Sequence, residues 1–423
     1  MKTTAAALAE VSAVLASIKT KGGILDDIAW PRDVEERFFA AQCARLPDPE
    51  YPAPDRDRLD DEIATLDRAR ASIEGDGAVA DWLRAVLASS IDRNRLLAAV
   101  GTRDFGRVSR EVYGGARSAL LGLGATNLDL SRHLQERLRI HGWDEARDAT
   151  DPAMDAEEFA AWLRERIARR KTELEVEVDP RCTSKAIAGS KRVRVRPDAR
   201  FSAWEAEGLY RHEVETHAYS AQNGAAQEHA PFLRAGGPRS TPTQEGLAVF
   251  AELYHRALAV PRLERLAVRV ETVAMAEDGA SFLDVFRFLV ARGAERRDAY
   301  LDAARIFRGG PPEGGGAFTK DACYLAGLVD VFTFLAAFVR GGFRDECEML
   351  VCGRFALDDI GALIELRAEG LLSRPRHRPR WLREWGTLLP YFAFTSFLDG
   401  LDLGPVEARH ADAIAAARGA TPR

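Results

Sequence analysis

The sequence predicts an α+β fold that is predominantly helical, with a small β-sheet beside a histidine-bearing helix. Apolar residues recur at three- and four-residue spacing through most of the chain, which is the period of amphipathic helices. One short region instead alternates apolar and polar residues with period two, as half-buried strands do. A segment with two histidines follows that region, so the sheet and this helix are expected to be neighbours.

An amphipathic helix within residues 1–29 is predicted to come first. Lys2 precedes an apolar stretch, but Glu10 interrupts it and its hydrophobicity comes mostly from alanine, so a secretory signal peptide is not expected. The larger apolar residues share one side of this helix: Leu8, Val11, Val14, Leu15 and Ile18.

Residues 30–423 are expected to form the main domain, which is long enough to bury a large core. The first part of this domain is predicted to be helical up to about residue 150. The motifs that carry chemistry lie between about residue 175 and residue 345, and a second helical part follows to the C-terminus.

The helical period is clearest in three stretches: residues 59–73, 78–98 and 157–174. A break rich in proline and aspartate is predicted at residues 148–152. Residues 309–316, with the sequence GGPPEGGG, are the strongest loop signal in the chain and are expected to join two helices.

Two short strands are predicted before the histidine-bearing helix. Residues 175–178 and 193–196 each alternate apolar and polar side chains, and a helix around residues 202–219 follows. A strand followed at once by such a helix is the usual setting of zinc peptidases. In that setting an edge strand can hold an extended peptide by backbone hydrogen bonds.

Composition and charge exclude several classes of function. The chain has 59 Lys+Arg against 65 Asp+Glu and a formal net charge of -6, whereas a nucleic-acid-binding protein needs a basic surplus or a basic face. No run of 18 apolar residues occurs, so no membrane span is expected. The five cysteines are scattered and odd in number, which argues against a disulfide framework and favours a reducing, cytoplasmic location.

The segment from His212 to His217 carries the residue types that zinc hydrolysis requires. Such a site needs three protein ligands, an open fourth position for water, and a carboxylate that takes the proton of that water. His212, His217 and the adjacent Glu213 provide two imidazoles and a carboxylate. Their spacing is H-E-x-x-x-H, one residue longer than the H-E-x-x-H motif that places both histidines on one helical face.

The longer spacing predicts a local deformation of the helix. In a regular α-helix, side chains five residues apart diverge by ~140°, against ~40° for side chains four residues apart. A π-bulge between Glu213 and His217 would absorb the extra residue and bring the two imidazoles together. In a regular helix, His212 and His217 would instead be ordinary surface or core histidines.

A further helix is predicted to begin at Thr241. Thr241 and Gln244 have the spacing of a capping box, and Pro242 falls at the first helical position. Gly246 costs ~1 kcal/mol relative to alanine inside a helix, so a close neighbour is expected there. That neighbour is either the histidine-bearing helix or another helix packed without any metal.

Glu245, in the first turns of this helix, is a candidate for the third metal ligand. Glu252 lies seven residues further on the same face, where it can orient a ligand histidine. Glu228 and His229 compete with Glu245 for the ligand position. They lie in a connector rich in glycine and proline, where such side chains are more often simply solvated.

Three motifs together resemble one protein family. They are the His-Glu-x-x-x-His segment, the QEGLA segment at residues 244–248 and the FTKDACYLAG segment at residues 318–327. From about residue 30 to about residue 400, the chain resembles the bacterial flavohemoglobin expression-modulating QEGLA-motif proteins. It is also similar to the microtubule-associated tyrosine carboxypeptidases, which remove the C-terminal tyrosine of α-tubulin.

The resemblance implies zinc as the cofactor and a role for each residue of the first two motifs. His212 and His217 match two zinc ligands of the family, and Glu245 matches the third. Glu213 matches the catalytic base. Residues 30–423 would accordingly form a zinc metallopeptidase-like domain.

The third motif resembles the KD-x-x-YL-x-G pattern of the family and contains Lys320 and Tyr324. A carboxypeptidase has to bind a terminal carboxylate and stabilise a developing oxyanion. Lys320 and Tyr324 are chemically suited to those tasks, as is Arg305 or Arg308 just before the glycine-rich loop. Tyr324 is equally compatible with a packed core tyrosine that makes one hydrogen bond.

The sequence therefore predicts a zinc metallocarboxypeptidase that cleaves peptide or protein C-terminal tails by means of zinc-activated water. The alternative is a regulatory or scaffold protein, an expression modulator whose metal site is structural or vestigial, because the name of the bacterial family records an effect on expression. An endopeptidase would differ only in how its cleft ends. The sequence leaves the oligomeric state and the preferred C-terminal residue open.

Overall fold

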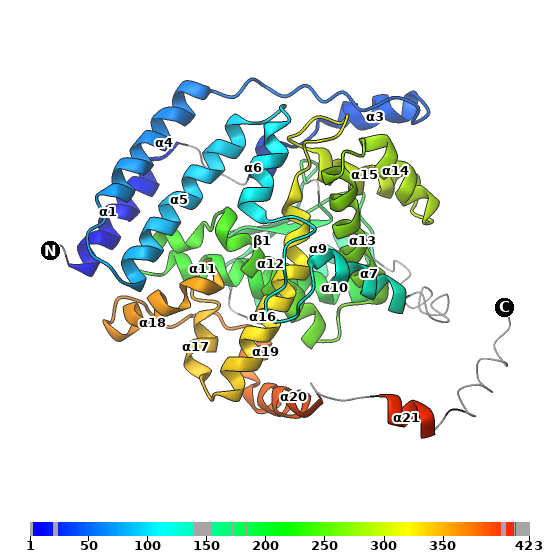
Figure 1. Cartoon of the computed structure of the whole chain (residues 1–423). Helices are drawn as coiled ribbons and strands as arrows, with labels where there is room; N and C mark the ends of the chain where they lie inside the picture. Colours follow the sequence, from blue (N-terminus) through cyan, green and yellow to red (C-terminus); the bar gives the residue numbers. More distant parts are fainter. Residues whose placement is uncertain are drawn as a thin grey trace.

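The computed structural model describes residues 3–19, 24–138, 154–170, 172–182, 184–398, 403–409 and 411. Within these residues the chain is mostly helical and forms one three-stranded sheet, which confirms the predicted α+β class (Figure 1). The break predicted at residues 148–152 lies outside the described residues, as does the expected boundary near residue 150.

Of the N-terminal helices, α1, α4, α5 and α6 pack side by side at one end of the molecule, whereas α3 and α7 lie apart from them (Figure 1). The larger apolar residues of α1 and Ile18 just after it are buried or half-buried against α4 and α5, as the amphipathic pattern predicts. The helices of this part are α1 (Thr4–Ser17), α2 (Ile24–Asp27), α3 (Arg32–Ala40), α4 (Arg56–Ala71), α5 (Ala78–Ala98), α6 (Asp104–Tyr113) and α7 (Asn127–Leu138).

A small sheet follows, and it contains both predicted strands. They are β1 (Glu175–Val178) and β3 (Arg192–Val195), with β2 (Ala186–Ala188) as an additional strand between them in sequence. The spatial order is β1-β3-β2, in which β1 runs parallel and β2 antiparallel to β3. Since β2 pairs only with β3, it is an edge strand of the sheet.

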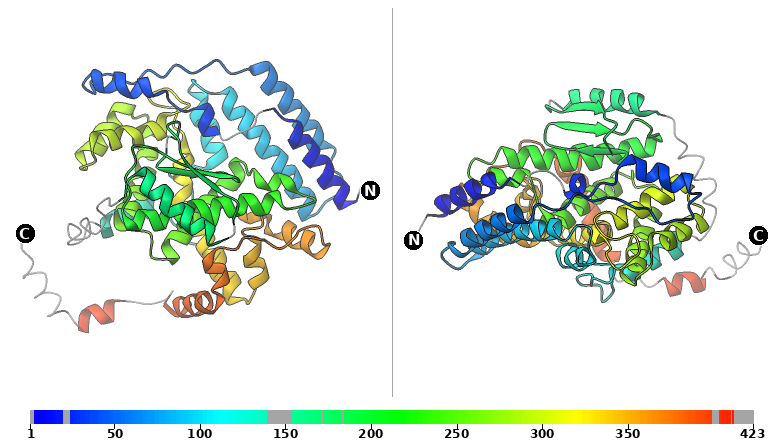
Figure 2. Two further views of the ribbon diagram at one scale, coloured as in Figure 1. Left: turned by 180° about the vertical axis from the view of Figure 1, so that it is seen from behind. Right: turned by 90° about the horizontal axis from the view of Figure 1, so that it is seen from above.

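One face of the sheet carries α9 (Ala156–Ala168), and the histidine-bearing helix lies against the other face (Figure 2, right). Helix α9 ends earlier than residue 174, where the sequence pattern predicted its end. The chain turns back after Ala168, and Arg164 donates a hydrogen bond of 2.8 Å to the carbonyl of Val176 at the start of the sheet. The region after the helix is needed for this reversal.

The histidine-bearing helix begins as regular α10 (Ala203–Leu209), passes through the π-helix η1 (Tyr210–Ala218), and continues as α11 (Tyr219–Ala225). Ser202 accepts a hydrogen bond from the amide of Glu205, whose carboxylate accepts one from the amide of Ser202, so a capping box fixes the start. Two short 3-10 turns, η2 (Pro231–Arg234) and η3 (Pro238–Ser240), lead into α12 (Thr241–Tyr254).

Helix α12 begins at Thr241 as predicted, but the predicted capping box does not form. The 3-10 turn η3 continues directly into α12, so Ser240 and not Thr241 is the N-cap residue. The hydroxyl of Thr241 donates a hydrogen bond to the carbonyl of Gly237, and the buried side-chain amide of Gln244 has no hydrogen-bond partner. Every residue from 243 to 252 of α12 is buried.

The remaining elements form the C-terminal half, and the predicted loop at residues 309–316 joins α15 to η4. These elements are α13 (Val260–Glu277), α14 (Phe282–Ala291), α15 (Arg296–Phe307), η4 (Thr319–Ala322), α16 (Cys323–Arg340), α17 (Arg344–Met349), η5 (Leu357–Asp359), α18 (Ile360–Ala368), α19 (Arg380–Arg383), α20 (Trp385–Leu398) and α21 (Gly404–Arg409).

Helices α12 and α16 cross in close contact near the centre of the molecule (Figure 1). A Cβ atom added at Gly246 would lie 2.1 Å from the carbonyl oxygen of Gly327, and one added at Gly327 would lie 2.1 Å from that of Pro242. The close neighbour expected at Gly246 is therefore α16, and not the histidine-bearing helix. Two glycines allow the two backbones to approach this far.

The stretch Thr319–Arg340, which contains α16, is long and apolar enough to cross a membrane by length and composition alone. Half of its most apolar window is buried inside the molecule, and its residues Val331, Leu335 and Val339 belong to the same core as Leu247 and Phe250 of α12. This packing is that of a core helix.

Replacing Gly246 with alanine is expected to destabilise the fold by at least ~2 kcal/mol, because the new methyl group overlaps a backbone carbonyl that cannot move away on its own. Chemical denaturation of the variant and the wild type measures the loss. Gly361→Ala in α18 is the matched control, since its nearest contact is 4.0 Å away and alanine has the higher helix propensity. Equal destabilisation by both changes would contradict the close crossing.

Candidate metal centre

The predicted deformation is present in the histidine-bearing helix, and it is longer than a single bulge. The π-helix η1 spans Tyr210–Ala218, so the whole segment from His212 to His217 lies inside it. In a π-helix the hydrogen bonds join residues five apart, so such residues stand above one another. The ring centroids of His212 and His217 are 4.8 Å apart. The prediction that the two imidazoles come together is confirmed.

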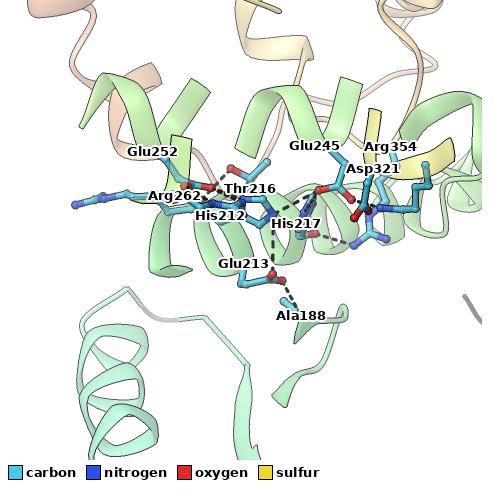
Figure 3. Close-up of polar contacts among 12 residues, drawn as sticks. Ala188, His212, Glu213, Thr216, His217, Glu245, Glu252, Arg262, Asp321 and Arg354 are labelled. Atoms are coloured by element: carbon cyan, nitrogen blue, oxygen red, sulfur yellow. Dashed lines mark hydrogen bonds and ion pairs between the residues drawn. The ribbon is translucent and has the colours of Figure 1, made fainter. Parts of the chain in front are cut away.

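Glu245 of α12 points at both histidines (Figure 3). Its Oε2 atom lies 3.4 Å from Nε2 of His212 and 3.6 Å from Nε2 of His217. Two ligands of a tetrahedral zinc ion, each 2.0–2.1 Å from the metal, stand ~3.3 Å apart. The same Oε2 atom is buried and has no hydrogen-bond partner. The three donor atoms therefore fit a zinc ion in both spacing and chemical type.

Among the described residues, this cluster is the one His/Cys/Asp/Glu group whose ligand atoms are spaced for a metal. The competing ligand candidates, Glu228 and His229, lie in the turn after α11 and are not part of it. His212 and Glu245 are buried, and His217 is largely buried. A metal held here would be shielded from bulk water except on the side of a cavity described below.

Glu252 orients His212 from the side opposite Glu245. Its Oε1 atom is 2.7 Å from Nδ1 of His212, so Nε2 of the ring is directed at the cluster. Arg262 of α13 in turn contacts both oxygens of Glu252, at 3.3 and 3.2 Å. Burial disfavours the charged imidazole, but the nearby carboxylates of Glu245 and Glu252 outweigh this and raise the pKa of His212 to about 10. The carboxylates thus create a strong local preference for positive charge.

The second carboxylate oxygen of Glu245 is occupied by Lys320 of η4. The ammonium of Lys320 lies 2.7 Å from Oε1 of Glu245. Burial raises the pKa of Glu245, but Lys320 and the two histidines outweigh this effect and hold it well below the usual value. Lys320, predicted to bind substrate, is therefore buried beside the candidate ligand Glu245 and is directed at it.

Glu213 lies beside the cluster without belonging to it. Its Oε1 atom is 4.0 Å from Nε2 of His212, and its Oε2 atom accepts a hydrogen bond of 2.8 Å from the backbone amide of Ala188 in β2 (Figure 3). The edge strand of the sheet thus holds the carboxylate in place. The sheet and η1 also share a hydrophobic cluster, which includes Val193, Val195 and Val214.

A cavity of about 850 Å³ opens next to the cluster. His212, Glu213 and Tyr324 border it at the cluster, and Trp30 borders it as well, on the segment between α2 and α3. Many of its other lining residues are arginines from α13 and α15. Of the three candidate ligands, His212 borders the cavity, and concave sites of this kind are where proteins usually bind small ligands.

Tyr324 is both a packed core residue and a neighbour of the cavity, the two possibilities that the sequence left open. It is buried and belongs to a hydrophobic cluster, and it also borders the cavity. Its ring is nearly parallel to that of His212 at 6.4 Å, and the ammonium of Lys320 lies 5.1 Å from the ring centre. Tyr324 is therefore next to the candidate metal site.

Arg305 and Arg308, the two arginines named before the glycine-rich loop, have different surroundings. Arg305 makes a two-pronged ion pair with Asp321, with distances of 2.7 and 2.8 Å. Arg308 borders the cavity and is only 7% exposed, and its Nε and Nη2 atoms have no hydrogen-bond partner.

Sequence reasoning did not identify Arg262, Ala188 or Arg354 as parts of the site. Arg354 donates a hydrogen bond of 3.1 Å to the carbonyl of His217, within the π-helix. Arg262 and Ala188 come from α13 and β2, and their contacts depend on how distant elements pack. No local spacing in the sequence indicates such contacts.

A model of the microtubule-associated tyrosine carboxypeptidase family matches residues 36–400, which is most of the chain. The chain belongs to this family. The similarity to the tyrosine carboxypeptidases that was inferred from the three motifs is thereby confirmed, and this family suggests a carboxypeptidase-like function. The comparison with curated proteins found no match. The matched residues include the π-helix, α12 and the third motif, so the whole cluster lies inside the family region.

Replacing Glu252 with glutamine is expected to weaken zinc binding by about 10- to 100-fold, because the neutral amide no longer orients His212 or increases its basicity. Competition with a chromophoric chelator measures the affinity. Glu348→Gln is the matched control, since Glu348 is also buried and paired with an arginine, Arg378, but lies outside the cluster. An unchanged zinc affinity in Glu252→Gln would contradict the orienting role.

Proposed function

We propose that the chain is a zinc-dependent metallopeptidase that acts as a carboxypeptidase on peptide or protein C-termini. The observation that carries the proposal is the position of Oε2 of Glu245, which has no hydrogen-bond partner and lies 3.4 and 3.6 Å from two imidazole nitrogens beside a cavity. Membership in a carboxypeptidase family supports the same conclusion.

His212, His217 and Glu245 would hold the zinc ion, whose chemistry is to polarise the substrate carbonyl and lower the pKa of a water molecule to about 7. Glu213 accepts the proton of the attacking water and delivers it to the leaving amine. Its carboxylate is suited to this because the amide of Ala188 holds it at the border of the cavity. Tyr324 is proposed to donate a hydrogen bond from its hydroxyl group to the developing oxyanion.

The edge strand β2 is proposed to hold the peptide substrate. Its residue Ala186 borders the cavity, and β3 pairs with only one side of β2. An extended peptide can add to such an edge through backbone hydrogen bonds, which are indifferent to side-chain identity. Because Ala188 of the same strand donates its amide to Glu213, a peptide paired with β2 would lie next to the proposed base.

The number of protein ligands supports an enzyme over a regulatory or scaffold protein with a structural site. Structural zinc sites are closed by four protein ligands, whereas catalytic sites have three and an open position. The described cluster has three ligand side chains, and the next carboxylate, that of Glu213, is 4.0 Å from His212. The cavity lies on the side of Glu213.

The proposed substrate is the C-terminal tail of a peptide or protein, and the microtubule association in the family's name is not assumed for this chain. The five cysteines are all free and buried, which supports the expected reducing, cytoplasmic location.

Glu213→Gln is expected to keep stoichiometric zinc and to lose peptide hydrolysis by about 10²- to 10⁴-fold, because the amide cannot take the proton from water. Metal analysis of the purified protein and hydrolysis of a panel of short peptides measure the two quantities. Full activity in Glu213→Gln would exclude this residue as the base. Stoichiometric zinc with no cleavage by the wild type would favour the scaffold alternative.

The ligand assignment can be tested by comparing His217, a proposed ligand, with His229, which lies outside the cluster. His217→Ala is expected to lose stoichiometric zinc, whereas His229→Ala, outside the cluster, is expected to retain it. Equal zinc content in the two variants, measured by metal analysis, would count against the proposed ligands.

A further inference from the structure

Arg308 is a buried cation at the wall of the cavity that the folded chain does not neutralise. Its side chain forms no hydrogen bond or ion pair with the described residues, and its Nε and Nη2 atoms are buried without a partner. A buried charge normally has a partner, because desolvation without one is costly. The missing acceptor is therefore expected from a ligand in the cavity.

The backbone turn at the end of α15 fixes the position of Arg308. Gly309 has a φ of +85°, and a Cβ atom there would lie 2.3 Å from the ring of Phe105, so the turn requires glycine. The amide of Gly309 donates a hydrogen bond of 2.7 Å to the hydroxyl of Tyr51, which also accepts one of 2.6 Å from Trp30. These contacts hold the backbone next to Arg308 in place.

The arginines around Arg308 already have carboxylate partners. Arg305 is paired with Asp321, and Arg269 contacts Asp302 at 2.8 Å and Asp321 at 3.8 Å. These two carboxylates balance these two guanidinium groups. Burial, and after it the charge of Arg305, lowers the pKa of Arg308 to about 10, so that Arg308 remains charged at neutral pH. Of these three arginines, Arg308 is the one for which the described residues supply no carboxylate partner.

Lys320 is the other cation that the sequence suggested for substrate binding, and its charge is matched by Glu245. Its ammonium is 2.7 Å from Oε1 of Glu245, and it is not among the residues that border the cavity. A substrate carboxylate would have to displace a metal ligand in order to reach it. Lys320 is therefore suited to hold Glu245 in position.

We infer that Arg308 is the receptor for the terminal carboxylate of the peptide substrate, and that Lys320 is a positioning residue for the metal ligand Glu245. The planar guanidinium of Arg308 can bind both oxygens of a carboxylate. A C-terminal amide is neutral and lacks the negative charge that this interaction requires. This inference rests on the proposed function and deepens it, because recognition of a free C-terminus distinguishes a carboxypeptidase from an endopeptidase.

The test compares one short peptide with a free C-terminal carboxylate and the same peptide with a C-terminal amide, using zinc-loaded full-length protein. The wild type is expected to prefer the free acid. In Arg308→Gln, kcat/KM for the free acid is expected to fall by about 100-fold, mainly through KM, while the amide is cleaved as before and the preference disappears. Arg308→Lys should restore part of the preference, because it restores the charge without the planar geometry.

Arg32→Gln is the matched control for the general charge of the cavity. Arg32 also borders the cavity, but its side chain is 83% exposed and pairs with Glu36 in its own helix. This variant is expected to keep the preference for the free acid. If Arg32→Gln loses as much preference as Arg308→Gln, the cavity attracts anions through its overall charge and the inference is wrong.

Zinc affinity separates the two cations without using activity. Arg308→Gln is expected to bind zinc like the wild type, whereas Lys320→Gln is expected to bind it about 10-fold more weakly, because Glu245 loses its second contact. A Lys320→Gln variant with normal zinc affinity and a lost preference for the free acid would exchange the two roles and overturn the inference.

Direct binding keeps the inference testable even if no peptide is cleaved. N-acetyl-phenylalanine and its amide, titrated against zinc-free wild type and Arg308→Gln in a thermal-shift assay, report the anion site alone. Stabilisation of the wild type by the acid only, lost in Arg308→Gln, supports the receptor. Absence of cleavage then counts against the proposed function alone, whereas equal effects of acid and amide on the wild type count against the receptor.

Discussion

The carboxylate of Glu245 is the contact on which the arrangement of the whole centre depends. One of its oxygens faces His212 and His217 of the π-helix, and the other accepts the ammonium of Lys320. Three segments that are far apart in the sequence therefore meet at one side chain. The low pKa of Glu245, caused by these cations against the effect of burial, keeps it ionised in a buried position, as a metal ligand must be.

Two backbone features make this meeting possible, and both are locally unfavourable. The π-helix at Tyr210–Ala218 gives up regular α-helical geometry in order to stack residues five apart. Gly246, next to Glu245, lowers helix propensity but lets α12 approach α16, the helix that follows the η4 turn carrying Lys320. Such local costs persist when the surrounding packing compensates for them, and they commonly mark functional sites.

The features that the sequence predicted well are those with a local physical cause. The five-residue spacing of His212 and His217 predicted π-type geometry, because a regular helix would separate the rings. Period-two alternation predicted β1 and β3, and the low helix propensity of Gly246 predicted a close crossing. The capping box at Thr241 failed because η3 runs directly into α12, which is a property of the preceding turn and not of the Thr-Gln spacing.

The partners of the charged groups could not be predicted, because each pair joins distant segments. Arg262 reaches Glu252, the amide of Ala188 reaches Glu213, and Lys320 reaches Glu245 only once the helices and the sheet are packed. Residue type alone made Lys320 and Arg308 equally suitable for a substrate carboxylate. Their difference is that Lys320 is paired with the carboxylate of Glu245, whereas Arg308 has no ion-pair partner among the described residues. Since desolvation makes an unpaired buried charge costly, the guanidinium that the protein leaves unmatched is the one available to a charged ligand.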